Sequence, residues 1–154
     1  MHRIMVALDG SALAEAVIPT VLDLAQAING EVVLVGVVIP APPTWGAGTP
    51  GWGPVGTWDL AMPPVEEELE ATRHYLEKVR DQMQLGDDRV TVDARLGVLP
   101  RALLEAAEAH QVDLIAMSTH GRGGLDRLVM GSVTDMLIRL AHVPILVVRP
   151  PVTG

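Results

Sequence analysis

Continuous apolar runs alternate with stripes of helical spacing along most of the chain. Residues 4–8, 31–39, 113–117 and 145–148 are mostly apolar, and each run has the length of one buried strand. Strands that are apolar on both faces are typical of a parallel sheet covered by helices on both sides. Residues 89–96 instead alternate between apolar and polar side chains, which indicates a half-buried strand at a sheet edge.

Four helices are expected between these strands. Ser11 can cap the first helix, and Pro19 lies inside it, so a bend or a loosened first turn is expected there. Two further helices are predicted at residues 99–110 and 132–141. The clearest helical stripe consists of Val65, Leu69, Thr72, Leu76, Val79 and Met83. This alternation of strands and helices predicts an α/β fold with one open parallel sheet.

One segment, at about residues 40–63, breaks this alternation. It is rich in proline and glycine and contains all three tryptophans of the chain. A mobile insert whose tryptophans dock on the protein's own surface is one interpretation, and a flap over a ligand or an arm onto a partner is the other. The 154 residues otherwise fit one domain, 1–154, with this segment as an insert.

Composition narrows the classes of function. The net charge of −8 argues against a nucleic-acid surface and against an anionic membrane face. The absence of cysteine excludes disulfides, thiol catalysis and thiolate metal sites. His2, His74, His110 and His142 lack metal-ligand spacing and are interpreted as ordinary surface or edge residues. No signal peptide and no membrane-spanning segment is recognised, so a cytoplasmic protein is expected.

The candidate chemistry lies between the fourth predicted strand and the last predicted helix. Residues 118–121 are Ser-Thr-His-Gly, and nine residues separate them from Gly131 and Ser132. Glycines let a backbone approach a phosphate closely, and the free N–H groups and dipole of a helix start favour an anion. The spacing therefore predicts a phosphate cradle, with plain turn and cap glycines as the alternative. Ser132 is expected to cap the helix, with Asp135 completing a capping box.

This segment closely resembles the ATP-binding members of the universal stress protein family, which carry G-x-x-G, nine residues and then G-[S/T]. Ser118 takes the place of the first glycine, Gly121 and Gly131 match the second and third, and Ser132 follows. The resemblance covers nearly the whole chain, including the first and last predicted strands. It implies a five-stranded parallel sheet of order 3-2-1-4-5 with helices on both faces, similar to the adenine nucleotide alpha hydrolases.

The resemblance also implies a function. It suggests ATP binding, with Mg²⁺ or Mn²⁺ beside the phosphates, in a nucleotide-dependent stress-response or signalling module. It further implies a homodimer through the last strand, residues 145–148, whose apolar edge would otherwise stay exposed. Nucleic acid and membrane are not expected as partners.

Binding residues follow from the resemblance. In the family, the aspartate that ends the first strand lies near the ribose or the phosphates, which corresponds to Asp9 here. A backbone position in the second strand, Val37 here, reads the adenine edge. The full set of expected nucleotide-binding residues is Ala7, Leu8, Asp9, Val37, Met117, Ser118, His120, Gly121, Arg122, Gly124, Gly131, Ser132, Val133 and Thr134.

Several of these residues have a second interpretation. Asp9 also suits a turn, Met117 also suits the core, and His120 also suits a structural hydrogen bond that holds the loop. Arg122 either pairs with phosphate or is solvated on an exposed loop. The side chain of Ser118 narrows the approach to the ribose or phosphate, whereas its hydroxyl can replace a water or donate to the ligand.

No catalytic residue and no protein metal ligand is predicted, so at most very slow ATP hydrolysis is expected. The sole lysine, Lys78, lies on a predicted helix, which excludes a Walker-type phosphate loop. The turn after the first strand lacks the three glycines of a dinucleotide fingerprint. Two alternatives stay open: a dimerisation module of the same family that binds no nucleotide, and a slow ATPase or phosphotransferase.

Overall fold

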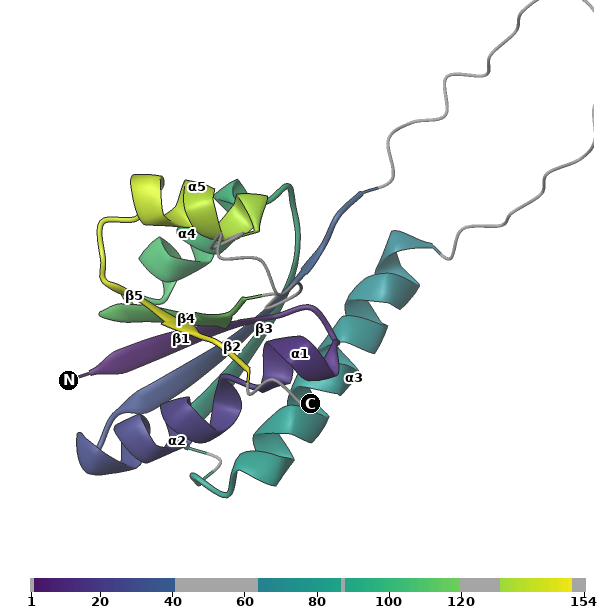
Figure 1. Ribbon diagram of the computed structural model, residues 1–154. Helices are drawn as coiled ribbons and strands as arrows, with labels where there is room; N and C mark the ends of the chain where they lie inside the picture. Colours follow the sequence, from purple (N-terminus) through teal and green to yellow (C-terminus); the bar gives the residue numbers. More distant parts are fainter. Residues whose placement is uncertain (1, 41–63, 87, 120–130, 151–154) are drawn as a thin grey trace, which may run out of the picture.

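The chain forms one open parallel sheet with helices packed on it (Figure 1). The computed structural model describes residues 2–40, 64–86, 88–119 and 131–150. The order of strands is β3-β2-β1-β4-β5, and every neighbouring pair is parallel. The strands are β1 (Arg3–Leu8), β2 (Glu31–Val38), β3 (Val90–Leu96), β4 (Leu114–Ser118) and β5 (Ile145–Val148). The predicted fold class and strand order are confirmed.

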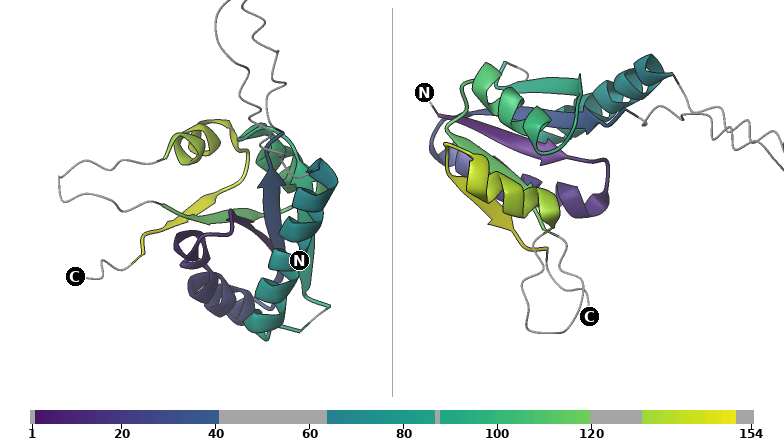
Figure 2. Two further views of the ribbon diagram at one scale, coloured as in Figure 1. Left: turned by 90° about the vertical axis from the view of Figure 1, so that its right-hand side faces the viewer. Right: turned by 90° about the horizontal axis from the view of Figure 1, so that it is seen from above.

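In the described ranges five helices cover the two faces of the sheet. They are α1 (Ala12–Glu15), α2 (Ile18–Ala27), α3 (Val65–Met83), α4 (Arg101–Ala109) and α5 (Ser132–Leu140). The first three lie on one face and the last two on the other, as the two views of Figure 2 show. Each helix runs back toward the amino ends of the strands, so its first turn lies at their carboxyl ends.

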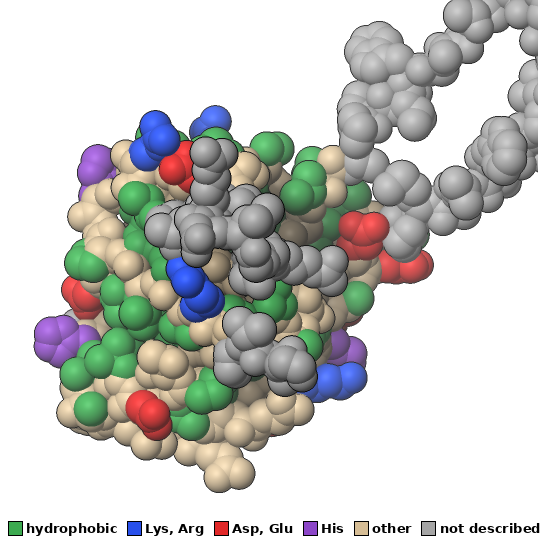
Figure 3. Space-filling view, in the orientation of Figure 1, with side chains coloured by type: hydrophobic (Ala, Val, Ile, Leu, Met, Phe, Trp, Pro, Cys, Tyr) green, Lys and Arg blue, Asp and Glu red, His purple; other side chains and the backbone are tan. Residues whose placement is uncertain are grey.

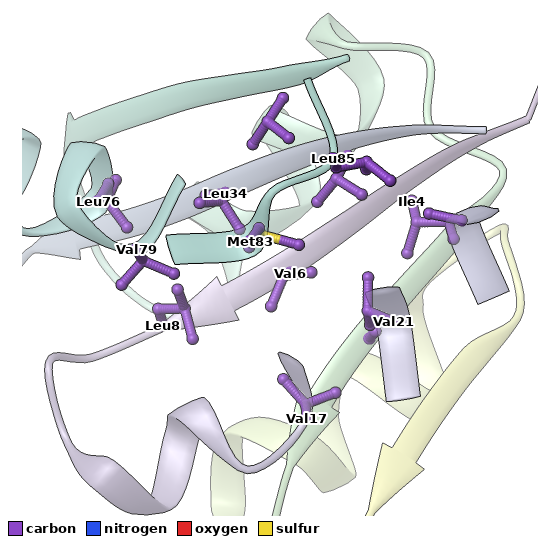
Figure 4. Packing of buried hydrophobic residues seen from close by; sticks show 14 residues of the cluster. Ile4, Val6, Leu8, Val17, Val21, Leu34, Leu76, Val79, Met83 and Leu85 are labelled. Carbon is purple, nitrogen blue, oxygen red and sulfur yellow. The ribbon is translucent and has the colours of Figure 1, made fainter. Parts of the chain in front are cut away.

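The alternation of side chains along β1 explains why both faces are covered. Ile4, Val6 and Leu8 pack in a cluster with α2 and α3 (Figure 4), and Met5 packs in a second cluster with α4 and α5. Successive side chains of a strand point to opposite faces, so a fully apolar run needs helices on both. The buried hydrophobic residues of the described chain are aliphatic or methionine, and the half-buried ring of Tyr75 packs against them.

The first predicted helix is divided in two, which is a correction. α1 ends at Glu15, and α2 begins at Ile18 with Pro19 in its first turn. Proline has no N–H to donate, and its ring collides with the carbonyl four residues earlier, so one continuous helix is interrupted here. The predicted cap is confirmed, because Ser11 Oγ accepts a hydrogen bond from the N–H of Ala14 at 3.1 Å.

Two predicted features lie outside the described residues: the tryptophan-containing insert, apart from Pro40, and the loop at 120–130. Within the described part of the chain, no helix combines the length and the apolar character that crossing a membrane requires.

Candidate functional site

A cavity of about 300 Å³ opens at the carboxyl ends of β1 and β4. These two strands are neighbours in the sheet, yet the chain leaves them toward opposite faces, through α1 after β1 and toward α5 after β4. A crevice forms outside such a switch point, where open α/β sheets bind their ligands. The volume is at the lower end of the range for small-molecule pockets.

The described members of the predicted binding set all line this cavity. They come from the ends of three strands and from the start of α5. They are Ala7, Leu8, Asp9, Val37, Met117, Ser118, Gly131, Ser132, Val133 and Thr134. The other members, His120, Gly121, Arg122 and Gly124, lie outside the described residues. Segments that are distant in the sequence therefore meet at one place.

Four further residues line the cavity and were not predicted to do so. Leu13 and Ala14 belong to α1, Leu103 belongs to α4, and Leu99 lies just before α4. Apolar periodicity assigns such residues to the core, because it does not distinguish a core contact from a cavity wall. Their position at helix starts is the signal that could have found them, since the first turns of these helices lie at the carboxyl edge of the sheet.

Asp9 has a structural role at the rim of the cavity. Its Oδ1 accepts a hydrogen bond from the N–H of Ser11 at 2.9 Å, and Gly10 between them has a φ of 81°. This geometry forms a turn that leads from β1 into α1. A carboxylate accepts several hydrogen bonds, so the turn is compatible with a ligand contact by the same side chain.

Tyr75 connects α3 to the wall of the cavity. Its hydroxyl donates to Glu15 Oε1 at 3.0 Å, and Glu15 is the last residue of α1. Burial, followed by the hydrogen bond to Glu15 and the negative charges of Glu15 and Asp9, raises the pKa of Tyr75 far above its ordinary value. The phenol therefore stays protonated and holds α1, with Leu13 and Ala14, against α3.

The start of α5 differs from the prediction. Gly131, not Ser132, is the N-cap, with φ −58° and ψ 150°, and Ser132 is the first helical residue. The predicted capping box is wrong, because the carboxylate of Asp135 pairs with Arg139 at 3.1 Å instead of reaching back to the helix start. Without a side-chain cap among the described residues, the first N–H groups of α5 remain available to an anion.

β4 contributes one apolar residue, Met117, and one polar residue, Ser118, to the cavity wall. Met117 is 6% exposed and packs in the cluster with α4 and α5, so its role in the core is real and coexists with its place in the cavity wall. The Oγ of Ser118 is buried and has no hydrogen-bond partner among the described residues. The apolar wall and the few polar groups together suit a ligand with an apolar and a polar end.

The amino-acid sequence is similar to those of universal stress proteins over nearly its whole length. A model of the universal stress protein family matches residues 1–149. The chain is 30% identical over 149 residues to universal stress protein MJ0531 of Methanocaldococcus jannaschii, covering 97% of this chain and 82% of that protein. It is 27% identical over 155 residues to universal stress protein A homolog 1 of Coxiella burnetii, covering 96% and 97%.

Solved structures share the fold. A universal stress protein in complex with cAMP has a TM-score of 0.66 at 17% identity, covering 97% of this chain and 98% of that one. Protein MJ0577 has a TM-score of 0.59 at 25% identity, covering 97% and 96%.

Proposed function

Since the chain belongs to the universal stress protein family, we propose that it binds ATP in the cavity at the carboxyl ends of β1 and β4. It then acts as a nucleotide-dependent stress-response or signalling module with little or no turnover. One observation carries this proposal: residues chosen from the sequence as nucleotide-binding, and scattered from Ala7 to Thr134, line a single cavity. The cAMP complex of a universal stress protein with the same fold supports it, because a protein of this fold holds an adenine nucleotide.

The chemistry of the walls fits the parts of the nucleotide. Val37, Leu99 and Leu103 provide an apolar surface for the adenine ring. The phosphates go to the start of α5, where the helix dipole and the N–H groups, which have no side-chain cap among the described residues, favour negative charge. A Cβ built on Gly131 meets no described protein atom within 4 Å, so the backbone borders open space through which a phosphate can approach.

The proposed Mg²⁺ or Mn²⁺ depends on the nucleotide for its ligands. The described residues contain no cluster of three or more histidine, aspartate or glutamate side chains that could hold a metal ion. Magnesium beside a nucleotide usually keeps several waters and binds phosphate oxygens with one or two carboxylates. In this proposal waters and phosphate oxygens therefore supply the metal ligands, and the Asp9 carboxylate of the cavity wall lies beside the ribose.

The proposed homodimer forms through β5. Within the described chain β5 pairs with β4 on one side only, and all four of its residues are partly exposed. Neighbouring α5 exposes Met136, Ile138 and Leu140, and Figure 3 shows hydrophobic side chains spread over the part of this face that carries β5. An apolar edge strand of this kind is stabilised by pairing, and a two-fold axis lets β5 pair with its own copy.

Thermal unfolding with increasing ATP and Mg²⁺ tests the proposed binding. The wild-type melting temperature is expected to rise with the logarithm of ATP concentration, because the ligand binds the folded state. Gly131→Val is expected to unfold at the wild-type temperature without ATP, since its side chain enters open space, and to show no rise with ATP. Ala109→Val, which also introduces a valine but at an exposed position of α4, is the control and keeps the full response.

Other outcomes of this experiment are equally clear. A Gly131→Val variant that binds ATP like the wild type shows that the phosphates lie elsewhere. A wild-type protein that does not respond to ATP, ADP, AMP or cAMP is a dimerisation module without a nucleotide. Phosphate release over hours at saturating ATP, lost in Ser132→Ala, indicates a slow ATPase.

A further inference from the structure

We infer that the Ser118 hydroxyl donates a hydrogen bond to a ribose hydroxyl of the bound nucleotide and thereby selects ribonucleotides. The inference rests on the nucleotide binding proposed above. Its starting point is the buried Oγ of Ser118, which has no hydrogen-bond partner among the described residues. Buried hydroxyl groups are nearly always paired, because an unpaired one has lost its hydrogen bonds to water. Ser118 lines the cavity, so a ligand there can supply the missing acceptor.

The described surroundings of Ser118 offer its hydroxyl no side-chain acceptor. Ile115 and Met117 belong to the cluster with α4 and α5, whereas Ala116 belongs to the cluster on the opposite face, with α2 and α3. Alternation along β4 places Ser118 on the same face as Ala116. On this face α1 contributes Leu13 and Ala14 to the cavity wall, and neither side chain accepts a hydrogen bond.

The order of elements indicates which part of the nucleotide meets Ser118. The sheet runs from β2 through β1 to β4, and α5 packs beside β4 and β5 (Figure 2). With adenine at Val37 of β2 and the phosphates at the start of α5, the sugar spans the ends of β1 and β4. The polar side chains that line the cavity at these two strand ends are Asp9 and Ser118.

This pair of side chains matches the chemistry of a sugar hydroxyl. An ionised carboxylate only accepts hydrogen bonds, whereas the serine hydroxyl also donates. A ribose hydroxyl both donates and accepts, so it suits Asp9 and Ser118 together. A phosphate oxygen would accept from Ser118 but would be repelled by the charge of Asp9. The ribose is therefore the better partner at this position.

Stability without ligand provides the first test. Because the hydroxyl has no partner in the described part of the chain, Ser118→Ala is expected to melt at the wild-type temperature or above it. A clear fall in the melting temperature would show that the hydroxyl is bonded within the protein, which overturns the inference. Thr91→Ala, which removes an exposed hydroxyl from β3 away from the cavity, is the matched control.

Calorimetric titration with ATP, 2′-deoxy-ATP and 3′-deoxy-ATP provides the second test. Wild type is expected to bind ATP about tenfold more tightly than the deoxy analogue that lacks the acceptor, the effect of one hydrogen bond. Ser118→Ala and Ser118→Gly are both expected to bind ATP about tenfold more weakly and to lose this preference. Agreement between the two variants attributes the effect to the hydroxyl and not to the Cβ.

The contrary results separate the inference from the proposed function. Wild-type affinity for ATP in Ser118→Ala overturns the inference while ATP binding stands. An equal loss for ATP and both deoxy analogues shows that the hydroxyl contacts a phosphate, which also overturns it. A wild-type protein that binds none of the three nucleotides refutes the proposed function itself.

Discussion

At the amino ends of the strands, charged side chains form hydrogen bonds with backbone groups. At the carboxyl ends, polar groups instead line a cavity. Arg3, at the start of β1, donates to Glu31 at the start of β2 at 2.7 and 2.9 Å and to the carbonyl of His110 at 2.6 Å. Its own N–H donates to Asp113 at 2.8 Å, just before β4. One arginine therefore connects the beginnings of three neighbouring strands.

Arg89 has a similar role one strand further along. Its guanidinium donates to the carbonyl of Gly30 at 2.6 Å and to that of Ala25, in the last turn of α2, at 2.9 Å. The Ala25 carbonyl also accepts from the N–H of Gly30 at 2.8 Å, so Arg89 adds a second hydrogen bond at the end of α2. The backbone groups at the amino ends of the strands, which we call the amino edge, are thus paired by side chains of the protein itself.

The carboxyl edge has the opposite character. The hydroxyl of Ser118 is unpaired among the described residues, and α5 begins without a side-chain cap. Unpaired polar groups cost stability, so they are expected where a ligand completes them. The amino ends of the strands hold the fold together, whereas the carboxyl ends carry the proposed binding site, and each substitution below tests this division.

The largest effect on stability is expected at Arg3. Arg3→Ala removes the contacts to Glu31 and leaves the carbonyl of His110 without this donor, so the free energy of unfolding is expected to fall by about 1–3 kcal/mol. Urea unfolding measures this change. The affinity for ATP is expected to stay within a factor of about two, because Arg3 lies at the edge opposite the cavity.

Arg101→Ala is the matched control for Arg3→Ala. Arg101 pairs with Glu105 on the surface of α4, where its side chain is 84% exposed, and such pairs contribute at most about 0.5 kcal/mol. Equal losses in the two variants would contradict a special role for the amino edge.

A smaller, pH-dependent effect is expected at Asp93 of β3. Burial raises the pKa of its carboxyl group, but hydrogen bonds from Arg95 and His110 outweigh burial and bring the pKa below its ordinary value of 3.8. Because the folded pKa lies below the unfolded one, the ionised carboxylate stabilises the fold above pH 3.8, and this contribution is lost as the pH falls through the folded pKa.

Asp93→Asn is therefore expected to be less stable than wild type near pH 6, with the difference shrinking below pH 3.8. Urea unfolding at a series of pH values measures this difference. A difference that is the same at pH 6 and at pH 3 would show that ionised Asp93 contributes nothing through its charge.

The smallest effect on stability is expected at Ser132. This residue is not the cap of α5, so Ser132→Ala is expected to change the free energy of unfolding by less than about 0.5 kcal/mol. Its affinity for ATP is expected to fall by roughly threefold to tenfold, because a phosphate loses one hydrogen-bond donor. Loss of stability without loss of affinity would reverse the division between the two edges.

Much of the fold could be predicted because local patterns determine it. The range of β5 was predicted to the residue, and the start of α3 at Val65 followed from the apolar stripe. At Pro19 the sequence predicts only a bend or a loosened turn. Whether a helix continues past a proline or is divided there depends on its packing, which the sequence does not show. The N-cap at Gly131 differs by one residue from the prediction, and this shift removed the expected capping box.

The amino-edge network could not be predicted, because its partners are far apart in the sequence. Arg3 and His110 are separated by 107 positions, and no periodic pattern relates them. His110 was interpreted as an ordinary surface or edge residue, but its Nε2 lies 2.8 Å from Asp93 Oδ2 and its side chain is only 26% exposed. Ser118, Gly131 and Ser132 were predictable because a motif of fixed spacing marks them. Asp9 and Val37 followed only from the family resemblance, and the roles of all these residues in binding stay predictions.

The short length of α1 makes its order depend on its contacts with other parts of the protein. Four residues are too few to form a helix unaided, so α1 persists through its Ser11 cap, its packing and the Tyr75 hydroxyl. An occupant of the cavity adds a further support through Leu13 and Ala14. A ligand there is therefore expected to increase the local order of α1, and the hydrogen bond between Tyr75 and Glu15 links α1 to the long helix α3.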